Sequence, residues 1–408
     1  MPPRVSWKLN LAMLWFSQLV IFAGFQALIP FVPLFIKNEL GITDEVELAT
    51  AVTAFNFFGT FAYAIFCPVW GMLADRFGVK PMLLRGTFVT GLIFPLMAYS
   101  KTVWFLVTLR FITAACAGTT AASQTMIVRN TPNEHQGFAL GVLTTAIWGG
   151  SMLGYVIGGL LIHYFDYTVA FWVCGAMYIA GGVSILFTRD GAIQAVHVKS
   201  HIESHGLNRL IPKFTRAVWV MLILFLIMGF IRSFEIPYVA LKVEELTSKE
   251  SAAFWTGVTS AIVCAVAIIS GIGTGYLVDR FPANKILLPV MIVSAAALAL
   301  QGFANNLWLF AAGRSLLYIA AGGLQPVLQK VLSSITPPRK RGGVFGFGSS
   351  TQGFGTMLAA VLSGVTMVQC GISGVFYIAA VFFAIALPIF MKGISFATRK
   401  PVFRRVRG

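Results

Sequence analysis

Long runs of apolar residues, interrupted by short polar loops, make up most of this chain. Residues 11–36 and 48–74, for example, contain no Asp, Glu, Lys or Arg. Each run is longer than the roughly 20 residues that a helix needs to cross a bilayer. The pattern predicts an all-α, polytopic membrane protein. Its twelve expected transmembrane helices cover residues 9–36, 48–73, 82–99, 103–127, 137–163, 168–187, 217–241, 252–278, 285–304, 307–331, 343–368 and 373–391.

A polar stretch divides these helices into two groups of six. We expect an N-terminal six-helix bundle in residues 1–187 and a cytoplasmic central loop in residues 188–215. A C-terminal six-helix bundle follows in residues 216–391, and a basic cytoplasmic tail in residues 392–408. The chain is therefore expected to consist of two comparable halves.

The two halves repeat each other in sequence. Gly71-Met72-Leu73-Ala74-Asp75-Arg76-Phe77 returns 204 residues later as Gly275-Tyr276-Leu277-Val278-Asp279-Arg280-Phe281. Arg110 and Arg314 are separated by the same 204 residues, and Ile29-Pro30 returns as Ile236-Pro237. Parallel repeats are typical of transporters in which one half rocks against the other around a central site. The repeat predicts two pseudo-symmetric bundles that work by alternating access.

Composition and charge agree with a membrane location. The residues are 57% hydrophobic and 11% charged, whereas about a quarter of the residues in a soluble domain are charged. With the N-terminus inside, 23 of the 30 basic residues fall on inner segments and four on outer loops. Positive charges on the inner loops predict that both termini lie in the cytoplasm. The protein itself is expected in the plasma (cell inner) membrane. The net charge is +16, and the basic residues are expected to contact anionic lipid headgroups, not nucleic acid.

No metal, cofactor or enzymatic site is expected. The five cysteines lie singly, without the spacing of metal ligands. His197, His201 and His205 recur every four residues in the central loop, where a solvated linker is favoured over a metal site. No nucleotide-binding GxxxxGK[ST] motif occurs, so an ion gradient is expected to supply the energy. Within the predicted helices, no pair of His, Asp or Ser residues has the spacing expected of a catalytic site.

The loop after the second predicted helix resembles a motif of the major facilitator superfamily. Gly71-Met72-Leu73-Ala74-Asp75-Arg76-Phe77-Gly78-Val79-Lys80 matches every fixed position of G-x-L-[AS]-D-R-x-G-x-[KR], and the second half keeps Gly275, Leu277, Asp279 and Arg280. The resemblance covers essentially the whole chain and implies the twelve-helix fold. It also implies that this loop latches an inner gate. The alternative is a solvated loop whose charges only set topology.

Two further helices carry signatures of that family. Leu109-Arg110-Phe111 with Gly118 is similar to its fourth-helix signature, which implies that Arg110 couples protons or substrate. A structural arginine bound to carbonyl groups is the alternative. Gly150, Gly154, Gly158 and Gly159 are similar to the antiporter motif GxxxGPxxGG of the fifth helix, with Tyr155 where proline is expected. Small residues four apart let this helix pack closely on a neighbour.

The seventh predicted helix contains the only acidic residue within a predicted span, Glu235. Arg232 lies three positions earlier, on the same helix face, so the two are expected to be able to pair. An acid inside a membrane is by default a functional candidate, and Glu235 is the best candidate for a proton-coupling carboxylate. The alternative is an ion pair that locks an outer gate. Helix 1 contains no Asp or Glu, only Gln18 and Gln26.

The chain is thus identified as a member of the superfamily, similar to its drug–proton antiporters and near the MdtG-like multidrug group. The resemblance implies proton-coupled efflux of a hydrophobic or amphipathic small molecule by a monomer in contact with membrane lipids. Polar substrate contacts are expected from Gln26, Gln124 and Arg314. A carrier of an organic anion or of a sugar-like or lipid-like metabolite is the alternative. A membrane-embedded enzyme or a receptor is the alternative from another class.

Overall fold

The computed structural model describes residues 7–132, 135–188, 214–281, 283–321, 324–336 and 341–398. Every regular element in this part of the chain is helical, as the apolar runs predict. The elements of the first half are α1 (Trp7–Gln26), η1 (Ile29–Phe31), α2 (Val32–Asn38), α3 (Glu45–Phe77), α4 (Val79–Met97), α5 (Val103–Ala115), α6 (Thr119–Asn130), α7 (Gln136–Tyr164) and α8 (Tyr167–Leu186). Those of the second half are α9 (Arg216–Ser233), η4 (Ile236–Tyr238), α10 (Val239–Leu246), α11 (Ala252–Arg280), α12 (Ala283–Phe303), α13 (Leu307–Ala321), α14 (Leu324–Ile335) and α15 (Arg341–Thr398).

The lengths of these helices are consistent with twelve membrane crossings. In the described ranges, nine helical segments are long and apolar enough to span a bilayer, and Val103–Ala115 and Leu307–Ala321 are shorter apolar helices. One of the nine, Phe347–Thr398, has 52 residues and contains two crossings joined at Gly371, whose φ is 68°. This last helix runs to Thr398, beyond the predicted end at residue 391.

Corresponding helices in the two halves are interrupted at corresponding places. The first crossing passes from α1 through η1 to α2 at Pro30, and the seventh passes from α9 through η4 to α10 at Pro237. Proline lacks the N–H that would continue the helical ladder, so the backbone tightens to a 3₁₀ turn at both sites. The fourth crossing, predicted as one helix, is divided into α5 and α6 at Gly118, whose φ of 122° favours glycine.

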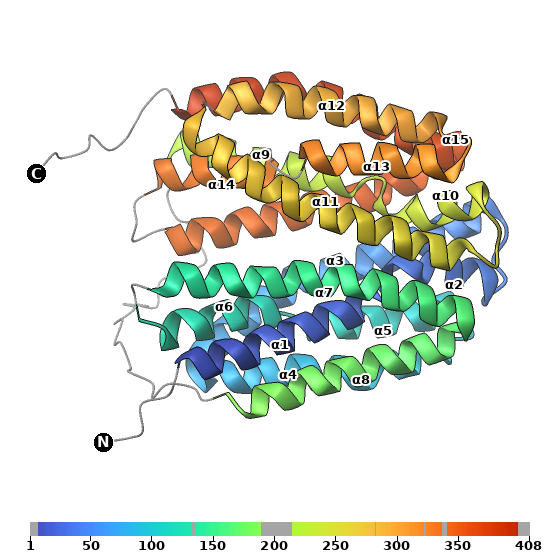
Figure 1. Ribbon diagram of the computed structural model, residues 1–408, viewed down its shortest axis with the longest axis horizontal. Coiled ribbons are helices and arrows are strands. Elements are labelled where there is room, and N and C mark those ends of the chain that lie inside the picture. The colour runs from blue at the N-terminus through green and yellow to red at the C-terminus, as the bar shows by residue number, and fades with distance from the viewer. Residues whose placement is uncertain are drawn as a thin grey trace, which may run out of the picture.

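The helices form two bundles that lie side by side (Figure 1), with α1 to α8 in one and α9 to α15 in the other. The bundles meet where α7 packs on α11 and where α3 packs on α15. In Figure 1 the start of α1 and the end of α15 lie at the same end of the molecule, which we call the terminal end, and α2 and α10 lie at the opposite end, which we call the loop end.

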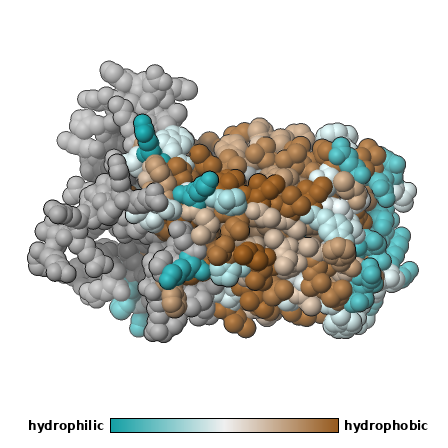
Figure 2. All heavy atoms as spheres, turned by 90° about the horizontal axis from the view of Figure 1, so that it is seen from above, coloured by the Kyte–Doolittle hydropathy of each residue, from teal (hydrophilic) through white to brown (hydrophobic). Residues whose placement is uncertain are grey.

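Two groups of buried side chains form the core. The larger group draws on both bundles and includes Phe31, Phe35, Tyr238 and Leu241 from α2, α10 and the turns before them. The smaller group, which includes Leu14, Val79 and Leu143, belongs to the N-terminal bundle alone. The space-filling view shows a broad apolar band bordered by hydrophilic residues at the loop end (Figure 2). Exposed apolar side chains such as Leu92 and Ile269 are suited to contact with lipid.

Candidate functional site

The two bundles touch backbone to backbone at the loop end. A Cβ atom added to Gly159 on α7 would lie 2.9 Å from the backbone oxygen of Ala253 and 3.1 Å from the Cα of Gly257, both on α11. In the corresponding place of the second half, a Cβ on Gly364 of α15 would collide with the Thr53 hydroxyl of α3. Thr53 also donates a hydrogen bond to the backbone oxygen of Ala360 at 3.3 Å. Glycines at matching positions thus close the loop end from both sides.

An ion pair joins the bundles at this same end. Lys37 Nζ on α2 lies 2.7 Å from Glu244 Oε2 on α10, and Asn38 Nδ2 donates to the other carboxylate oxygen of Glu244 at 3.4 Å. The Glu244 side chain is largely buried, whereas that of Lys37 is 35% exposed. We call Lys37, Asn38 and Glu244 the loop-end gate. Because each bundle supplies one charge, the attraction exists only while the loop end is closed.

Weakening the loop-end gate is expected to favour opening at that end. Glu244→Gln removes the charge pair, and a partly exposed pair contributes about 0.2–1 kcal/mol, which corresponds to a shift of up to about fivefold in the equilibrium. Labelling of a single cysteine at Thr53, in a background without native cysteines, measures the opening. The charge-reversed double variant Lys37→Glu/Glu244→Lys is the control and is expected to restore slow labelling. Equal labelling rates in the native protein, in Glu244→Gln and in the double variant would show that the Lys37–Glu244 pair does not hold the loop end closed.

Glu235 pairs with an arginine that is distant in sequence. Its Oε2 lies 2.9 Å from Arg314 Nη1 on α13, and the two residues are only 2% and 4% exposed. The structure therefore replaces the predicted pairing with Arg232 by a pairing with Arg314. The reason is local: Glu235 is the residue before η4, where the chain leaves the regular α9 helix, so the i, i+3 relation to Arg232 no longer sets its direction.

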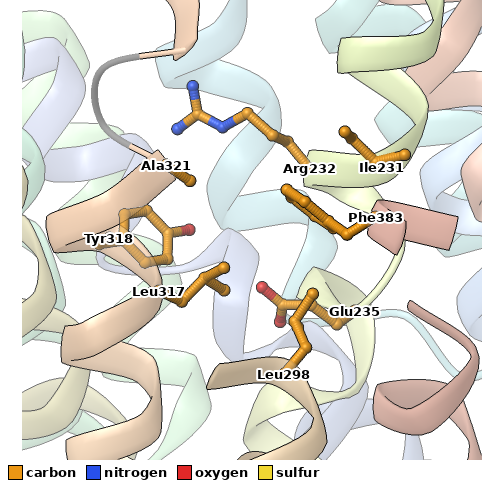
Figure 3. Close-up of a pocket in the computed structure, with 8 residues that line it drawn as sticks. All are labelled: Ile231, Arg232, Glu235, Leu298, Leu317, Tyr318, Ala321 and Phe383. Atoms are coloured by element: carbon orange, nitrogen blue, oxygen red, sulfur yellow. The ribbon is translucent and has the colours of Figure 1, made fainter. Parts of the chain in front are cut away.

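The close-up in Figure 3 shows the surroundings of this carboxylate. Arg232 points away from Glu235, whereas Tyr318 and Leu317 of α13 and Phe383 of α15 face the space beside it. That space is about 10 Å³, close to the smallest volume that holds one water molecule. The pair is thus shielded from bulk water in this conformation.

A residue from the other bundle contributes to the surroundings of the pair. Tyr155 of α7 lies near both Arg314 and Glu235, as does Tyr318 of α13. Tyr155 stands in the fifth-helix motif where proline is expected, and sequence reasoning assigned it no role. Its aromatic hydroxyl within a glycine-rich helix face is the signal that could have pointed to it. The ion pair therefore lies where both bundles can respond to its charge state.

Arg110 lies in the N-terminal bundle, apart from this pair. It lines a cavity of about 320 Å³, and its Cζ lies 5.3 Å from the centre of the Phe25 ring and 5.5 Å from that of Phe55. Its Nε is buried without a hydrogen-bond partner. Gln26 is half-buried where α1 meets Gly154, and Gln124 is exposed on α6. Neither glutamine belongs to the wall of the cavities that contain Arg110 and Glu235.

The glycines of the fifth-helix motif bring α7 onto α1. Cβ atoms added to Gly150 and Gly154 would collide with the backbone oxygens of Leu19 and Ala23 on α1, and one added to Gly158 with that of Ala27, the residue directly after α1. The fourth glycine, Gly159, instead faces α11 of the other bundle, as described above. One helix thus carries a packing face within its bundle and a contact face between bundles.

The repeated loop motif lies at the terminal end. Gly78, with a φ of 94°, separates α3 from α4, and Lys80 Nζ donates to the backbone oxygens of Leu186 and Thr188 at 2.7 and 2.6 Å. A cation at the C-terminal end of α8 is favourable for the helix dipole. The remaining side chains of the motif lie outside the described part of the structure: Asp75, Arg76, Asp279 and Arg280, with Gly71 and Gly275. The latch role of the motif stays a prediction.

Comparison with known proteins decides the family. The family model described as Major Facilitator Superfamily matches residues 14–300 and 258–402, which together cover nearly the whole chain. The chain belongs to the Major Facilitator Superfamily. It is therefore a multi-pass membrane transporter of small molecules.

Relatives with similar sequences carry names that refer to drug resistance. The multidrug resistance protein MdtG of Proteus mirabilis (strain HI4320) is 28% identical over 399 residues, which are 97% of this chain and 98% of that protein. The protein of the same name from Salmonella paratyphi B (strain ATCC BAA-1250 / SPB7) is 29% identical over 384 residues, 92% and 93% of the two chains. The predicted resemblance to the MdtG-like group is confirmed.

Solved transporter structures share the fold. A D-xylose–proton symporter superposes with a TM-score of 0.78 at 15% identity, covering 97% of this chain and 100% of that one. A bacterial homologue of the human lysosomal transporter Spinster, in an inward-facing and occupied conformation, gives a TM-score of 0.76 at 16% identity and covers 97% and 98%. At these identities the likeness establishes the fold and not the substrate.

Proposed function

We propose that this transporter is a proton-coupled exporter of hydrophobic or amphipathic small molecules. It acts as a monomer in the cell inner membrane, with both termini in the cytoplasm. The names and full-length match of the MdtG relatives support drug export, and the positive charges on alternate loops support this orientation. With the terminal end in the cytoplasm, a closed loop end means that the protein faces inward, ready to load cargo.

The observation that carries the proposal is the buried ion pair between Glu235 and Arg314 at 2.9 Å. An ionisable pair inside a membrane protein marks a proton or ion pathway by default. Uptake of a proton by Glu235 neutralises its carboxylate and removes the attraction between α9 and α13. Tyr155 of α7 lies near the same charges, so the N-terminal bundle responds to their loss.

The remaining sites take complementary roles in this cycle. Arg110 contacts cargo or a coupled group in the N-terminal bundle, and Arg232 beside the small cavity helps to set the charge around Glu235. Asp75, Arg76, Asp279 and Arg280 hold the cytoplasmic end closed in the opposite, outward-facing state. The loop-end gate holds the inward-facing state. A proton gradient supplies the energy, and no cofactor takes part.

Two measurements test the proposal. Expression in a host that lacks its own pumps is expected to raise the tolerated concentration of several unrelated hydrophobic drugs by at least about fourfold. Proteoliposomes with an imposed pH gradient are expected to transport one such drug, and collapse of the gradient with a protonophore is expected to stop it. Transport that is indifferent to the pH gradient would refute proton coupling, and unchanged susceptibility to every drug tested would refute multidrug export.

A further inference from the structure

The N-terminal bundle contains an internal cavity with a single charge in its wall. The cavity measures about 320 Å³, within the usual range for ligand pockets, and α1, α3, α4, α5, α6 and α8 all contribute to it. Its apolar part is largely aromatic, with rings from Phe22, Phe25, Tyr63, Phe94 and Tyr178. Such a wall suits an apolar molecule about the size of a two-ring aromatic compound.

The single charge is the guanidinium of Arg110, and no carboxylate balances it. Within the described residues, the cavity wall contains no Asp or Glu, and the Nε of Arg110 has no hydrogen-bond acceptor. The centres of the Phe25 and Phe55 rings lie 5.3 and 5.5 Å from its Cζ, at the distance of a cation–π contact. These rings do not fill the hydrogen-bonding positions of the guanidinium, which carries five N–H donors and no acceptor.

The interruption of the fourth crossing adds a second source of positive potential. Trp70 and Arg85 donate hydrogen bonds to the backbone oxygens of Ala115 and Cys116 at 2.6 and 3.0 Å, so the C-terminal end of α5 is satisfied. The N-terminal end of α6, at Thr119, faces the cavity, and its N-cap residue Gly118 has no side chain to accept from the first N–H groups. Free N–H groups at a helix N-terminus favour an anion.

The internal repeat provides a comparison within the same chain. Arg314, the counterpart of Arg110, is neutralised by Glu235 at 2.9 Å. Ile236-Pro237 corresponds to Ile29-Pro30, so the counterpart of Glu235 in the first half is Leu28. Leu28 is an uncharged residue that is 1% exposed. The first half therefore keeps the arginine of the repeat and lacks its acid.

We propose that this cavity is a binding site for an amphipathic carboxylate, whose charged group supplies the missing partner of Arg110. The carboxylate lies between the guanidinium and the N-terminal end of α6, and the apolar body lies among the aromatic rings. This inference deepens the proposed export function by naming a class of cargo, and it rests on that function only for the direction of transport. A charge-assisted arginine–carboxylate pair is roughly twice as strong as a neutral hydrogen bond.

Binding to the purified protein in a neutral detergent tests the site without any transport step. 2-Naphthoate is the probe, and its uncharged isostere 2-naphthamide is the matched ligand. Calorimetry is expected to show saturable binding of the carboxylate, with at least tenfold weaker binding of the amide. Arg110→Gln is expected to remove the preference for the carboxylate, and Arg110→Lys to keep a part of it. Arg216→Gln, which removes an exposed arginine from α9, is the control and is expected to bind as the native protein does.

A second variant keeps the test decisive if Arg110→Gln does not fold. Leu28→Glu places a glutamate at the position of the first half that corresponds to Glu235. This glutamate is expected to pair with Arg110 and to weaken 2-naphthoate binding at least tenfold. Equal binding of acid and amide by the native protein would overturn the proposal, as would full binding by folded Arg110→Gln or Leu28→Glu. Failure of proton-driven export alone would leave the binding result standing, so the two proposals fail separately.

Discussion

Glu235→Gln is expected to reduce proton-driven export by at least about 100-fold. Glutamine keeps the size of the side chain and a carbonyl oxygen for Arg314, but it takes up no proton at physiological pH. If Glu235 is the coupling carboxylate, the variant can no longer link proton movement to the change between inward-facing and outward-facing states. Drug transport into proteoliposomes with an imposed pH gradient measures the effect, and exchange of cargo without a gradient is expected to persist.

The variant also removes one member of a buried ion pair, so stability needs its own control. An arginine left alone in this environment costs about 3–5 kcal/mol in the stability of the fold. The double variant Glu235→Gln/Arg314→Gln removes both charges and is expected to recover most of the melting temperature without recovering proton-driven export. Restored export in the double variant would show that the pair has a structural role and that protons enter elsewhere.

Tyr155→Phe separates the contribution of the N-terminal bundle from that of the ion pair. The change deletes one hydroxyl from α7 and leaves Arg314 and Glu235 in place. We expect a roughly three- to tenfold loss of proton-driven export with little change in melting temperature, because Tyr155 lies near both charges. Export at the native rate would limit the coupling machinery to the C-terminal bundle.

The overall fold follows from features that act over short stretches of sequence. Apolar runs long enough to cross a bilayer predict the helices, and the repeated Gly71–Phe77 and Gly275–Phe281 segments predict the two bundles. The interruption of the fourth crossing was missed because Gly118 in an apolar run has no local signal that separates a break from ordinary close packing. Glycine is frequent in membrane helices both where helices break and where they pack closely.

The partners within the site depend on contacts that are distant in sequence. Glu235 and Arg314 were each recognised as candidates, because an ionisable residue within an apolar run is conspicuous. Their pairing joins residues 79 positions apart, and it depends on the turn at Pro237, whose effect on side-chain direction the i, i+3 rule does not include. The role of Tyr155 was missed for the same reason, since its partners lie in the other bundle.

Two adjacent glycines of α7 are expected to give opposite kinds of defect. Gly158→Ala drives a methyl group into the backbone directly after α1, within the same bundle, where the carbonyl carbon of Ala27 would lie 2.7 Å away. Helix α7 must then move away from α1, and overpacking of this kind costs about 1–3 kcal/mol. Gly159→Ala instead meets α11 of the other bundle, so the strain is relieved when the loop end opens. The first variant is expected to melt earlier, and the second to favour the state open at the loop end.

Melting temperature and labelling of a Thr53→Cys reporter, in a background without native cysteines, distinguish the two defects. Gly149→Ala is the matched control, because a Cβ atom at this position of α7 has no atom within 4 Å. It is expected to keep or slightly raise the melting temperature, since alanine is favoured over glycine in a helix by about 1 kcal/mol. Faster labelling of the Gly159→Ala protein at an unchanged melting temperature would identify α7–α11 as the surface along which the bundles separate. Loss of stability in that variant instead would mean that the contact holds the fold together and does not control access.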